Sequence, residues 1–353
     1  MAKYMSVEEL YRISGVNEFS FNTIYSLVWL KENNPEVLSK MEGFLFMPSI
    51  FVNKLTGNLV NDVTMAGTSM LTDLKERHFS NKILTEVGIP QRFFELKEPG
   101  TIAGTLLPEI AKELGLPVGL PVVLTGHDTQ FALIGSGAGE NDVVLSSGTW
   151  EILMTRCRKA STDIASFKKG LTNEFDAQPG LYNTGIQWLA SGVLEWVRNM
   201  FYTVDVSLGE NIYDIMISEA SAVKWEDSKI KFSPDFINHA GSITGINLKT
   251  SRQQIYRAAI ESLVDKTAES LKLLEKTGQF KATSLIVVGG GAKNELWNQL
   301  RTNRLGIPVK IAEQSETTVL GASLFAHAAV GNIKSVDEGM KTLCRNYRIV
   351  KPE

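Results

Sequence analysis

The chain contains 353 residues, a length typical of about two domains. Its 36 Lys and Arg residues and 39 Asp and Glu residues give a net charge of −3, so nucleic acid is not an expected partner. Apolar residues make up 43% and charged residues 21% of the chain, as in an ordinary globular protein. The sequence has neither the apolar core of a signal peptide nor the roughly 20-residue apolar stretch of a membrane span, so we expect a cytoplasmic enzyme or binding protein.

Cysteine and histidine are too sparse to indicate a metal centre. Cys157 and Cys344 cannot build a disulfide scaffold or a four-thiolate site, and we interpret both as buried or partly buried thiols. No spacing typical of a zinc site relates the four histidines, which are His78, His127, His239 and His327. The residues by themselves therefore predict no metal ligand.

The first 120 residues read as helices around a turn-rich middle. Helical patterns cover residues 6–14, 25–33 and 108–114, and residues 55–72 are rich in turn formers. This segment contains too few strand patterns to form a complete α/β domain.

From residue 121 onward, strands alternate with helices. Short β-branched runs bounded by turn residues predict strands at 121–125, 142–147, 151–156, 284–289 and 308–312, with others near 181–183 and 242–246. Apolar residues at helical spacing predict helices at 185–201 and 251–277, from 293 onward and over 316–326. Thr250 and Gln253 could form a capping box for the long helix, and Gly278 stands where a C-terminal cap belongs. This order indicates an α/β fold with a largely parallel sheet.

The segment GHDTQ (126–130) places a carboxylate directly after a predicted strand. Ligands of open α/β sheets bind outside the carboxyl ends of strands, where Asp128 could act as a general base toward a substrate hydroxyl. The alternative is that Asp128 only caps the helix that follows. The spacing leaves both roles open.

Two glycine-containing turns could hold phosphate or a nucleotide. In LSSGTWE (145–151), Ser147, Gly148 and Thr149 offer backbone N–H groups and hydroxyls to phosphate oxygens, although a plain hairpin turn has the same pattern. In VVGGGAKNELW (287–297), three glycines follow a strand and precede a helix, which favours close approach of a ligand over a simple turn. Farther on, Gly321 and Ala322 lie within a helical pattern, which indicates close helix packing or one wall of a nucleotide pocket, and packing is the favoured interpretation.

The order of these motifs resembles the FGGY family of carbohydrate kinases, within the actin and hexokinase superfamily of ATPases. The segment 241–261, GSITGINLKTSRQQIYRAAIE, is similar to the second signature of that family. The segment 21–33, FNTIYSLVWLKEN, resembles the first signature but has Ser26 where a lysine is expected. Residues 126–154 and 180–201 are most similar to the members that phosphorylate L-fuculose.

The resemblance implies an actin-like, ribonuclease H-like ATPase fold, with two domains around a nucleotide cleft. It implies transfer of the γ-phosphoryl group of ATP to the 1-hydroxyl of L-fuculose, with Mg²⁺ bridging the phosphates and Asp128 as the general base. L-Rhamnulose and D-xylulose are the competing sugars. By the same resemblance, phosphate and nucleotide are bound by Ser147, Gly148, Thr149, Gly289, Gly290, Gly291 and Asn294. The sugar is expected to contact Asp62, Trp150 and Gln187.

Aligned on these motifs, residues 1–137 correspond to part of the sugar-binding domain and residues 138–353 to the nucleotide-binding domain. The first domain is expected to be incomplete, because no counterpart of the family's first phosphate loop precedes Asp128. A non-catalytic remnant that binds nucleotide is therefore the alternative hypothesis. The expected partners are a sugar and ATP, without nucleic acid or membrane, and a homo-oligomer is compatible with the sequence.

Overall fold

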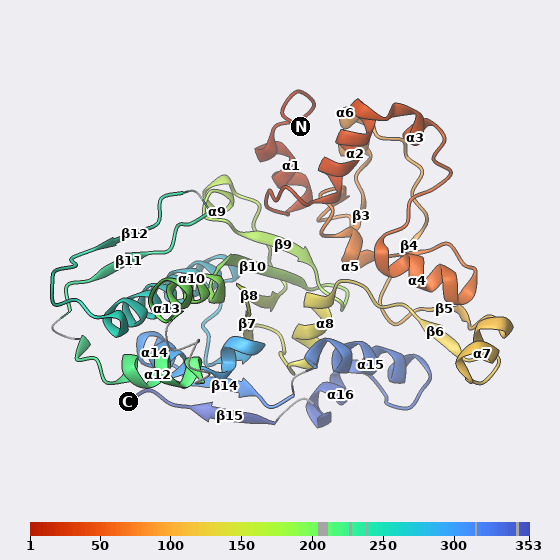
Figure 1. The fold of residues 1–353 in the computed structure, drawn as a ribbon. Coiled ribbons are helices and arrows are strands. Elements are labelled where there is room, and N and C mark those ends of the chain that lie inside the picture. Colours follow the sequence, from red (N-terminus) through yellow and green to blue (C-terminus); the bar gives the residue numbers. More distant parts are fainter. Residues whose placement is uncertain (204–210, 226–227, 238, 315, 344–345) are drawn as a thin grey trace.

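The computed structural model describes residues 1–203, 211–225, 228–237, 239–314, 316–343 and 346–353. Figure 1 shows two lobes that meet beside helix α8 (Asp128–Gly135). We call α1 to α7 with their small sheets the N-terminal lobe, and the seven-stranded sheet with its helices the sheet lobe. Among the described residues, no helix is long and apolar enough to cross a membrane.

The N-terminal lobe consists of helices joined by short strands. Every sheet within residues 1–127, all of which are described, has only two strands. The predicted helices 6–14, 25–33 and 108–114 are confirmed to within two residues. The helices are α1 (Val7–Ser14), α2 (Thr23–Asn33), α3 (Pro35–Ser39), α4 (Met47–Thr56), α5 (Val63–Ala66), α6 (Asn81–Val87) and α7 (Pro108–Leu114). The strand pairs are β1 (Asn61–Asp62) with β4 (Leu96–Lys97), β2 (Thr72–Asp73) with β3 (His78–Phe79), and β5 (Ile102–Thr105) with β6 (Pro121–Val123).

Strand β6 does not belong to the main sheet, although its short β-branched run predicted a buried strand there. It pairs antiparallel with β5 in a separate two-stranded sheet, and its own residues are exposed or half-buried. Only Leu124, just after the strand, is fully buried. A short β-branched run fits a pleated surface of either kind, so its composition did not distinguish the two sheets.

The sheet lobe is built on a mixed seven-stranded sheet. Strands β7, β13 and β14 run parallel, and the remaining pairs are antiparallel. The predicted largely parallel sheet is therefore wrong, because the tight turn between β7 and β8 joins antiparallel neighbours. In spatial order the strands are β15 (Tyr347–Val350), β14 (Val309–Ala312), β13 (Leu285–Val288), β7 (Val143–Ser147), β8 (Trp150–Cys157), β10 (Tyr182–Leu189) and β9 (Thr172–Phe175).

Helices cover both faces of this sheet. The long helix α13 (Arg252–Gly278) packs on one face through a core that includes Val143, Leu145 and Val287. On that side it contacts α10 (Ser191–Phe201), α12 (Ile212–Ser221) and α14 (Glu295–Leu305). Leu133 of α8 packs on the opposite face with Val144 and Ile286. The alternation of adjacent β7 residues between two cores is the period-2 pattern of a buried strand.

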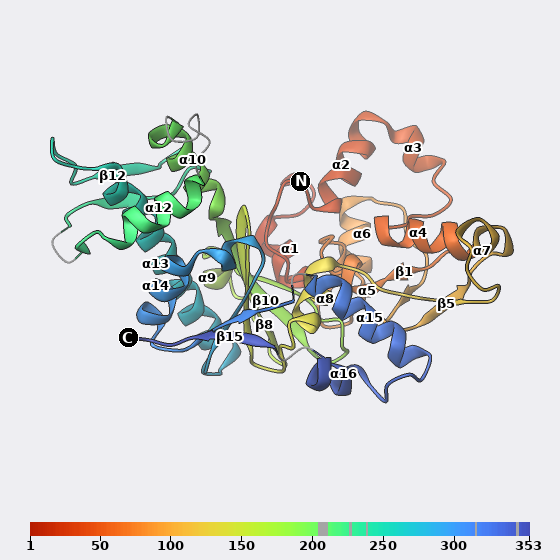
Figure 2. The same ribbon diagram turned by 60° about the horizontal axis from the view of Figure 1, so that its bottom comes forward.

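Helix α8 packs closely along α15 (Thr317–Ala329), beside α16 (Val336–Leu343) (Figure 2). A Cβ atom on Gly135 would lie 1.8 Å from the carbonyl oxygen of Thr317. A Cβ atom on Gly321 would lie 1.9 Å from the carbonyl oxygen of Phe131. The prediction of close packing at Gly321 is thus confirmed.

Three predicted elements have different bounds. Residues 185–189 belong to β10, where all five pair with β8 and Gly185 also pairs with β9, and the helix begins only at Ser191. The capping box of α13 is Ser251 with Gln254, one residue later than predicted, and Gln279 rather than Gly278 adopts the left-handed conformation after it. Strand β12 (Ser242–Thr244) pairs with β11 (Lys231–Ser233) outside the main sheet. The remaining elements are α9 (Ile164–Phe167) and the 3₁₀-helix η2 (Gly290–Lys293).

Of the two cysteines, Cys157 is buried and free, as predicted. Cys344 lies outside the described residues.

Candidate functional site

Asp128 presents an exposed carboxylate at the beginning of α8. Its side chain is 78% exposed, and Oδ1 accepts a hydrogen bond from the N–H of Thr129 at 2.8 Å. The helix N-cap is His127, without a side-chain capping bond. The interpretation of Asp128 as the helix cap is therefore wrong, and its carboxylate is left accessible to a ligand.

Buried polar groups fix the backbone next to Asp128. Gln130 donates from Nε2 to Glu174 Oε2 on β9 at 2.6 Å, and its Oε1 lies 2.6 Å from Nδ1 of His127. The backbone N–H of His127 donates to Thr64 Oγ1 at 3.0 Å. Residues from both lobes thus hold the turn that carries Asp128.

A cavity of about 300 Å³ borders this turn, and we call it the sugar cavity after the ligand that the sequence resemblance predicts. This volume is at the lower end of the range typical of small-molecule sites. Its polar lining comes from the N-terminal lobe, the turn and the sheet, namely Asn22, Thr23, Thr68, His127, Thr129, Thr172, Glu174 and Gln187. Of the three predicted sugar contacts, only Gln187 lines it.

Asp62 does not line the sugar cavity and instead packs against the Asp128 turn at Gly126. It is fully buried, and its Oδ1 accepts hydrogen bonds from the Thr64 hydroxyl and, at 3.0 Å, from the N–H of Met65. Burial raises the pKa of Asp62 to about 6, against the opposing effect of these hydrogen bonds. A Cβ atom at position 126 would lie 1.7 Å from Asp62 Oδ1, which explains the glycine of GHDTQ. No described group hydrogen-bonds to Asp62 Oδ2.

A second, smaller cavity of about 120 Å³ connects Asp128 to the central strands. Its polar lining is Asp128, Thr129, Ser146 and Thr318, above apolar residues of β7, β8 and β13. Since Thr129 also lines the sugar cavity, Asp128 lies between that cavity and the end of β7.

The turn after β7 differs in one respect from a simple phosphate loop. The Ser147 side chain is fully buried, and its hydroxyl donates to Glu151 Oε1 at 2.8 Å. Arg301 of α14 donates to both Ser147 Oγ, at 3.2 Å, and Glu151 Oε1. The Ser147 hydroxyl therefore anchors the turn from inside, while Gly148 is half-buried and Thr149 is exposed at the surface.

Glu151 and Arg301 form a buried ion pair beneath this turn. Both side chains are fully buried, and Trp188 donates from Nε1 to Glu151 Oε2 at 3.1 Å. Burial raises the pKa of Glu151, an effect opposed by Arg301 and by the hydrogen bonds from Ser147 and Trp188. Neither residue was singled out from the sequence, because they lie 150 positions apart and no local pattern links them.

The three glycines after β13 serve two purposes. Gly289 has φ of +89°, and a Cβ atom there would lie 2.6 Å from the carbonyl oxygen of Ser147. A Cβ atom on Gly291 would lie 2.1 Å from Ser147 Oγ, whereas Gly290 faces open space. Gly289 and Gly291 therefore permit close packing on the phosphate turn, and Gly290 leaves room beside it. The packing at Gly289 and Gly291 is that of a close turn, and the approach of a ligand at Gly290 stays a prediction.

A cavity of about 510 Å³ opens beside these glycines, and we call it the nucleotide cavity after the ligand that the sequence resemblance predicts. Asn294 lines it and caps α14 by accepting a hydrogen bond from Trp297 N at 3.0 Å. Asn294 Nδ2 also donates to the Tyr256 hydroxyl at 3.2 Å. Further lining residues that sequence reasoning missed are Glu195, Tyr213, Tyr256 and Trp297, which come from four different helices.

Trp150 lies at the beginning of β8, 42% exposed and opposite Leu189. It borders neither the sugar cavity nor the nucleotide cavity. The structure thus gathers Asp128, Gln187, the β7–β8 turn and the three glycines around the carboxyl ends of β7 and β13, and leaves Asp62 below and Trp150 beside them.

The chain is similar to known proteins over both lobes. Residues 1–135 match the N-terminal domain of the FGGY family of carbohydrate kinases, and residues 143–330 match its C-terminal domain. The L-fuculokinase of Escherichia coli (strain K12) is 47% identical over 99% of this chain and 74% of its own length. The L-fuculokinase of Haemophilus influenzae is 40% identical over 100% of this chain and 75% of its own length.

A solved structure shows the same fold. The crystal structure of xylulose kinase from Rhodospirillum rubrum superposes with a TM-score of 0.88 at 20% sequence identity, covering 100% of this chain and 72% of that one. The actin-like ATPase fold implied by the sequence is therefore confirmed. On the two domain matches and the identity to curated relatives, this chain belongs to the FGGY family of carbohydrate kinases.

Proposed function

We propose that this chain is an ATP-dependent sugar kinase that converts L-fuculose to L-fuculose 1-phosphate. The observation that carries the proposal is the exposed Asp128 carboxylate, which stands between a polar sugar cavity and the end of the phosphate strand. The identity to curated L-fuculokinases supports L-fuculose as the substrate.

In this mechanism Asp128 accepts the proton of the sugar 1-hydroxyl as that oxygen attacks the γ-phosphorus of ATP, while the bond from the γ-phosphorus to the bridging oxygen breaks and ADP leaves. The Asp128 carboxylate accepts a hydrogen bond from Thr129 N–H but is not the cap of α8. The helix therefore need not move to make this carboxylate available to the sugar. Because phosphoryl transfer depends mainly on positioning and charge stabilisation, one oriented carboxylate supplies the acid–base chemistry that the protein needs.

The two substrates occupy different cavities. Gln187, Glu174 and Asn22 offer hydrogen-bonding groups to sugar hydroxyls, and the nucleotide cavity receives the adenosine beside Gly290 and Asn294. Gly148 and Thr149 hold phosphate at the turn, which Ser147 anchors from below. Asp62 acts through the Asp128 turn rather than by touching the sugar, and a sugar contact from Trp150 stays a prediction.

Mg²⁺ accompanies ATP in this proposal. No cluster of three or more His, Cys, Asp or Glu side chains among the described residues could hold a metal ion. This fits an ion carried in by the nucleotide, since Mg²⁺ commonly retains water and binds phosphate oxygens with only one or two carboxylates. Among the described residues, Asp128, Glu195 and Asp214 present carboxylates at the smaller cavity and the nucleotide cavity, and the ion would neutralise phosphate charge.

The test is a coupled ADP-release assay with ATP, Mg²⁺ and each of L-fuculose, L-rhamnulose and D-xylulose. We expect the highest kcat/KM for L-fuculose and a loss of about 10²- to 10⁴-fold in kcat for Asp128→Asn, the range typical of a general base. Glu109→Gln is the matched control, because it also neutralises an exposed carboxylate in the first turn of a helix, α7.

Three results would contradict parts of the proposal. A higher kcat/KM for another ketose would remove the substrate assignment. Equal turnover by Asp128→Asn and Glu109→Gln would contradict the assignment of Asp128 as the general base. Folded wild-type chain that binds ADP without turnover would support the alternative of a nucleotide-binding remnant.

A further inference from the structure

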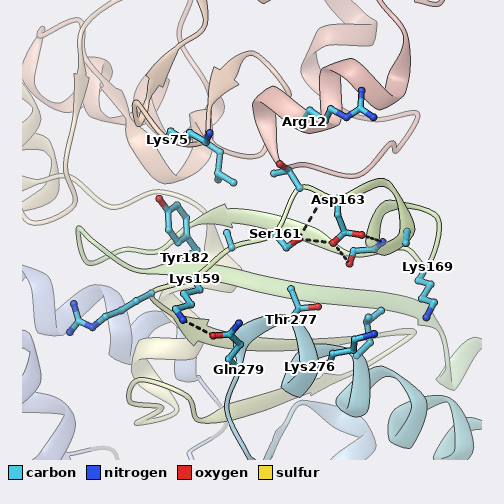
Figure 3. Close-up of a pocket in the computed structure, with 17 residues that line it drawn as sticks. Arg12, Lys75, Lys159, Ser161, Asp163, Lys169, Tyr182, Lys276, Thr277 and Gln279 are labelled. Atoms are coloured by element: carbon cyan, nitrogen blue, oxygen red, sulfur yellow. Dashed lines mark hydrogen bonds between the residues drawn. The ribbon is translucent and has the colours of Figure 1, made fainter.

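A third cavity, of about 730 Å³, lies between the two lobes and away from the site described above (Figure 3). Its lining comes from α1, the segment between β2 and β3, the loop from β8 to α9, and the end of α13. Strand β8 begins at the phosphate turn and ends at Cys157, immediately before the lining residues Arg158 and Lys159. The cavity therefore lies at the end of the sheet opposite to the phosphate turn.

Positive charge dominates this cavity. One carboxylate, that of Asp163, lines it. The cationic lining residues are Arg12, Lys75, Arg158, Lys159, Lys169 and Lys276. Figure 3 shows Arg12 and Lys75 on one side of the space, and Lys159, Lys169 and Lys276 on the other. In a chain with a net charge of −3, this concentration of cations is a local feature of the fold.

Four of these six cations have no hydrogen-bond or ion-pair partner among the described residues. Arg158 pairs with Glu140 at 3.0 Å, and Lys159 donates to Gln279 Oε1 at 2.5 Å. The side-chain nitrogens of the other four form no hydrogen bond or ion pair with any described residue; they belong to Arg12, Lys75, Lys169 and Lys276. Like charges gathered around one cavity repel one another. An anion placed among them would be attracted by each cation and would reduce this repulsion.

Asp163 contributes one negative charge against the six cations, so the lining keeps an excess of positive charge, and the oxygens of Asp163 already accept hydrogen bonds within the loop. It accepts hydrogen bonds from the hydroxyls of Ser161, at 2.6 Å, and Ser166, at 2.7 Å, and caps α9 through Ser166 N–H at 2.9 Å. These bonds lower the pKa of Asp163 to about 2. Tyr182 and Thr277 add hydroxyl groups to the lining, which can donate to an anion's oxygen atoms.

We propose that this cavity binds a small phosphorylated anion that carries two or more phosphate groups. The volume is within the range typical of small-molecule sites and exceeds the needs of a single phosphate ion. The cations surround a cavity instead of following an extended face, which fits a compact ligand rather than nucleic acid. Because both lobes supply cations, the bound anion would hold α1 and the sheet lobe together.

The probe is inorganic tripolyphosphate, titrated calorimetrically into the full chain in the presence of saturating ADP. We expect binding that weakens as salt is raised, and roughly tenfold weaker binding after Lys75→Glu or Lys276→Glu, since each reversal replaces an attraction with a repulsion. Lys112→Glu on α7 is the matched control, because it makes the same charge change at an exposed lysine outside the cavity. Where a reversal impairs folding, Lys75→Met and Lys276→Met replace it.

Binding that is lost in the cavity variants and kept within about twofold by Lys112→Glu supports the site. Absent binding overturns it, and so does equal weakening by all three reversals, which would indicate non-specific attraction. Since the variants locate the ligand and the readout is heat, either result is independent of kinase activity.

Discussion

Glu151 carries a buried charge directly beneath the phosphate turn, and its only described cationic partner is Arg301. Replacing Glu151 by Gln leaves the guanidinium of Arg301 buried without its counter-ion, which we expect to lower the free energy of unfolding by about 3–5 kcal/mol. Urea unfolding of the single variant measures this loss.

The double variant Glu151→Leu with Arg301→Met separates stability from positioning. Removing both charges together should restore most of the stability, because apolar replacements of a buried ion pair are often neutral or better. Ser147 then keeps neither of its two anchors, so we expect a raised KM for ATP in the double variant. A double variant with the wild-type KM would mean that the network stabilises the lobe without positioning the turn.

Asp62 makes the stability of the protein depend on pH. Its pKa rises from the ordinary 3.8 to about 6 in the folded chain, so the folded state holds the proton more tightly than the unfolded state. The contribution to stability is therefore full below about pH 4, falls as the pH rises to about 6, and amounts to about 3 kcal/mol.

The measurement is urea unfolding of wild type and Asp62→Asn between pH 4 and pH 8. We expect the wild type to lose stability with rising pH relative to Asp62→Asn, because the amide keeps the acceptor oxygen and cannot ionise. Parallel pH profiles for the two proteins would contradict the burial argument.

At the scale of elements, the contact between α8 and α15 sets the position of Asp128. Gly135 and Gly321 let the two helices approach until an added Cβ atom would overlap the facing backbone. We expect Gly321→Ala to lower the free energy of unfolding by about 2–3 kcal/mol, because backbone must move to admit the methyl group.

Gly139→Ala is the control for this prediction. A Cβ atom there would meet Asp142 Oδ2 at 3.5 Å, an ordinary van der Waals distance, and we expect little change in stability. Equal effects of the two substitutions in urea unfolding would show that the helix contact is looser than the structure indicates.

Strand β10 shows why local patterns misplace some elements. Residues 185–189 continue the helical spacing of α10, yet all five pair with β8, and Gly185 also pairs with β9. Short apolar runs fit a buried strand and a helix equally well, and the hydrogen bonds of neighbouring strands decide between them. The same strand turns Gln187 into the sugar cavity and Trp188 toward Glu151.

At the scale of the whole molecule, the end of α1 joins the lobes at the edge of the sheet. Asn17 donates from Nδ2 to the carbonyl oxygens of Phe167 and Leu171 at 2.9 and 3.0 Å. Asn173 N–H donates to the carbonyl oxygen of Gly15 at 2.8 Å, so the N-terminal lobe covers part of the edge strand β9. Glu174 on this strand in turn bonds Gln130 beside the Asp128 turn. The sugar cavity and the third cavity, which six cations line, therefore both depend on how the two lobes meet.

The sequence by itself determined the family, part of the alternation of strands and helices in the sheet lobe, without β9, α12 and β15, and the segments that carry Asp128 and the glycines. These properties reside in local spacing, in turn chemistry and in motif order, all of which are readable along one chain. Only the tertiary structure decided that the Ser147 hydroxyl faces inward, that Asp62 lies below the site, and that Glu151 meets Arg301. Those facts depend on contacts between residues far apart in sequence, because the fold and not the local pattern selects which side chains share a buried space.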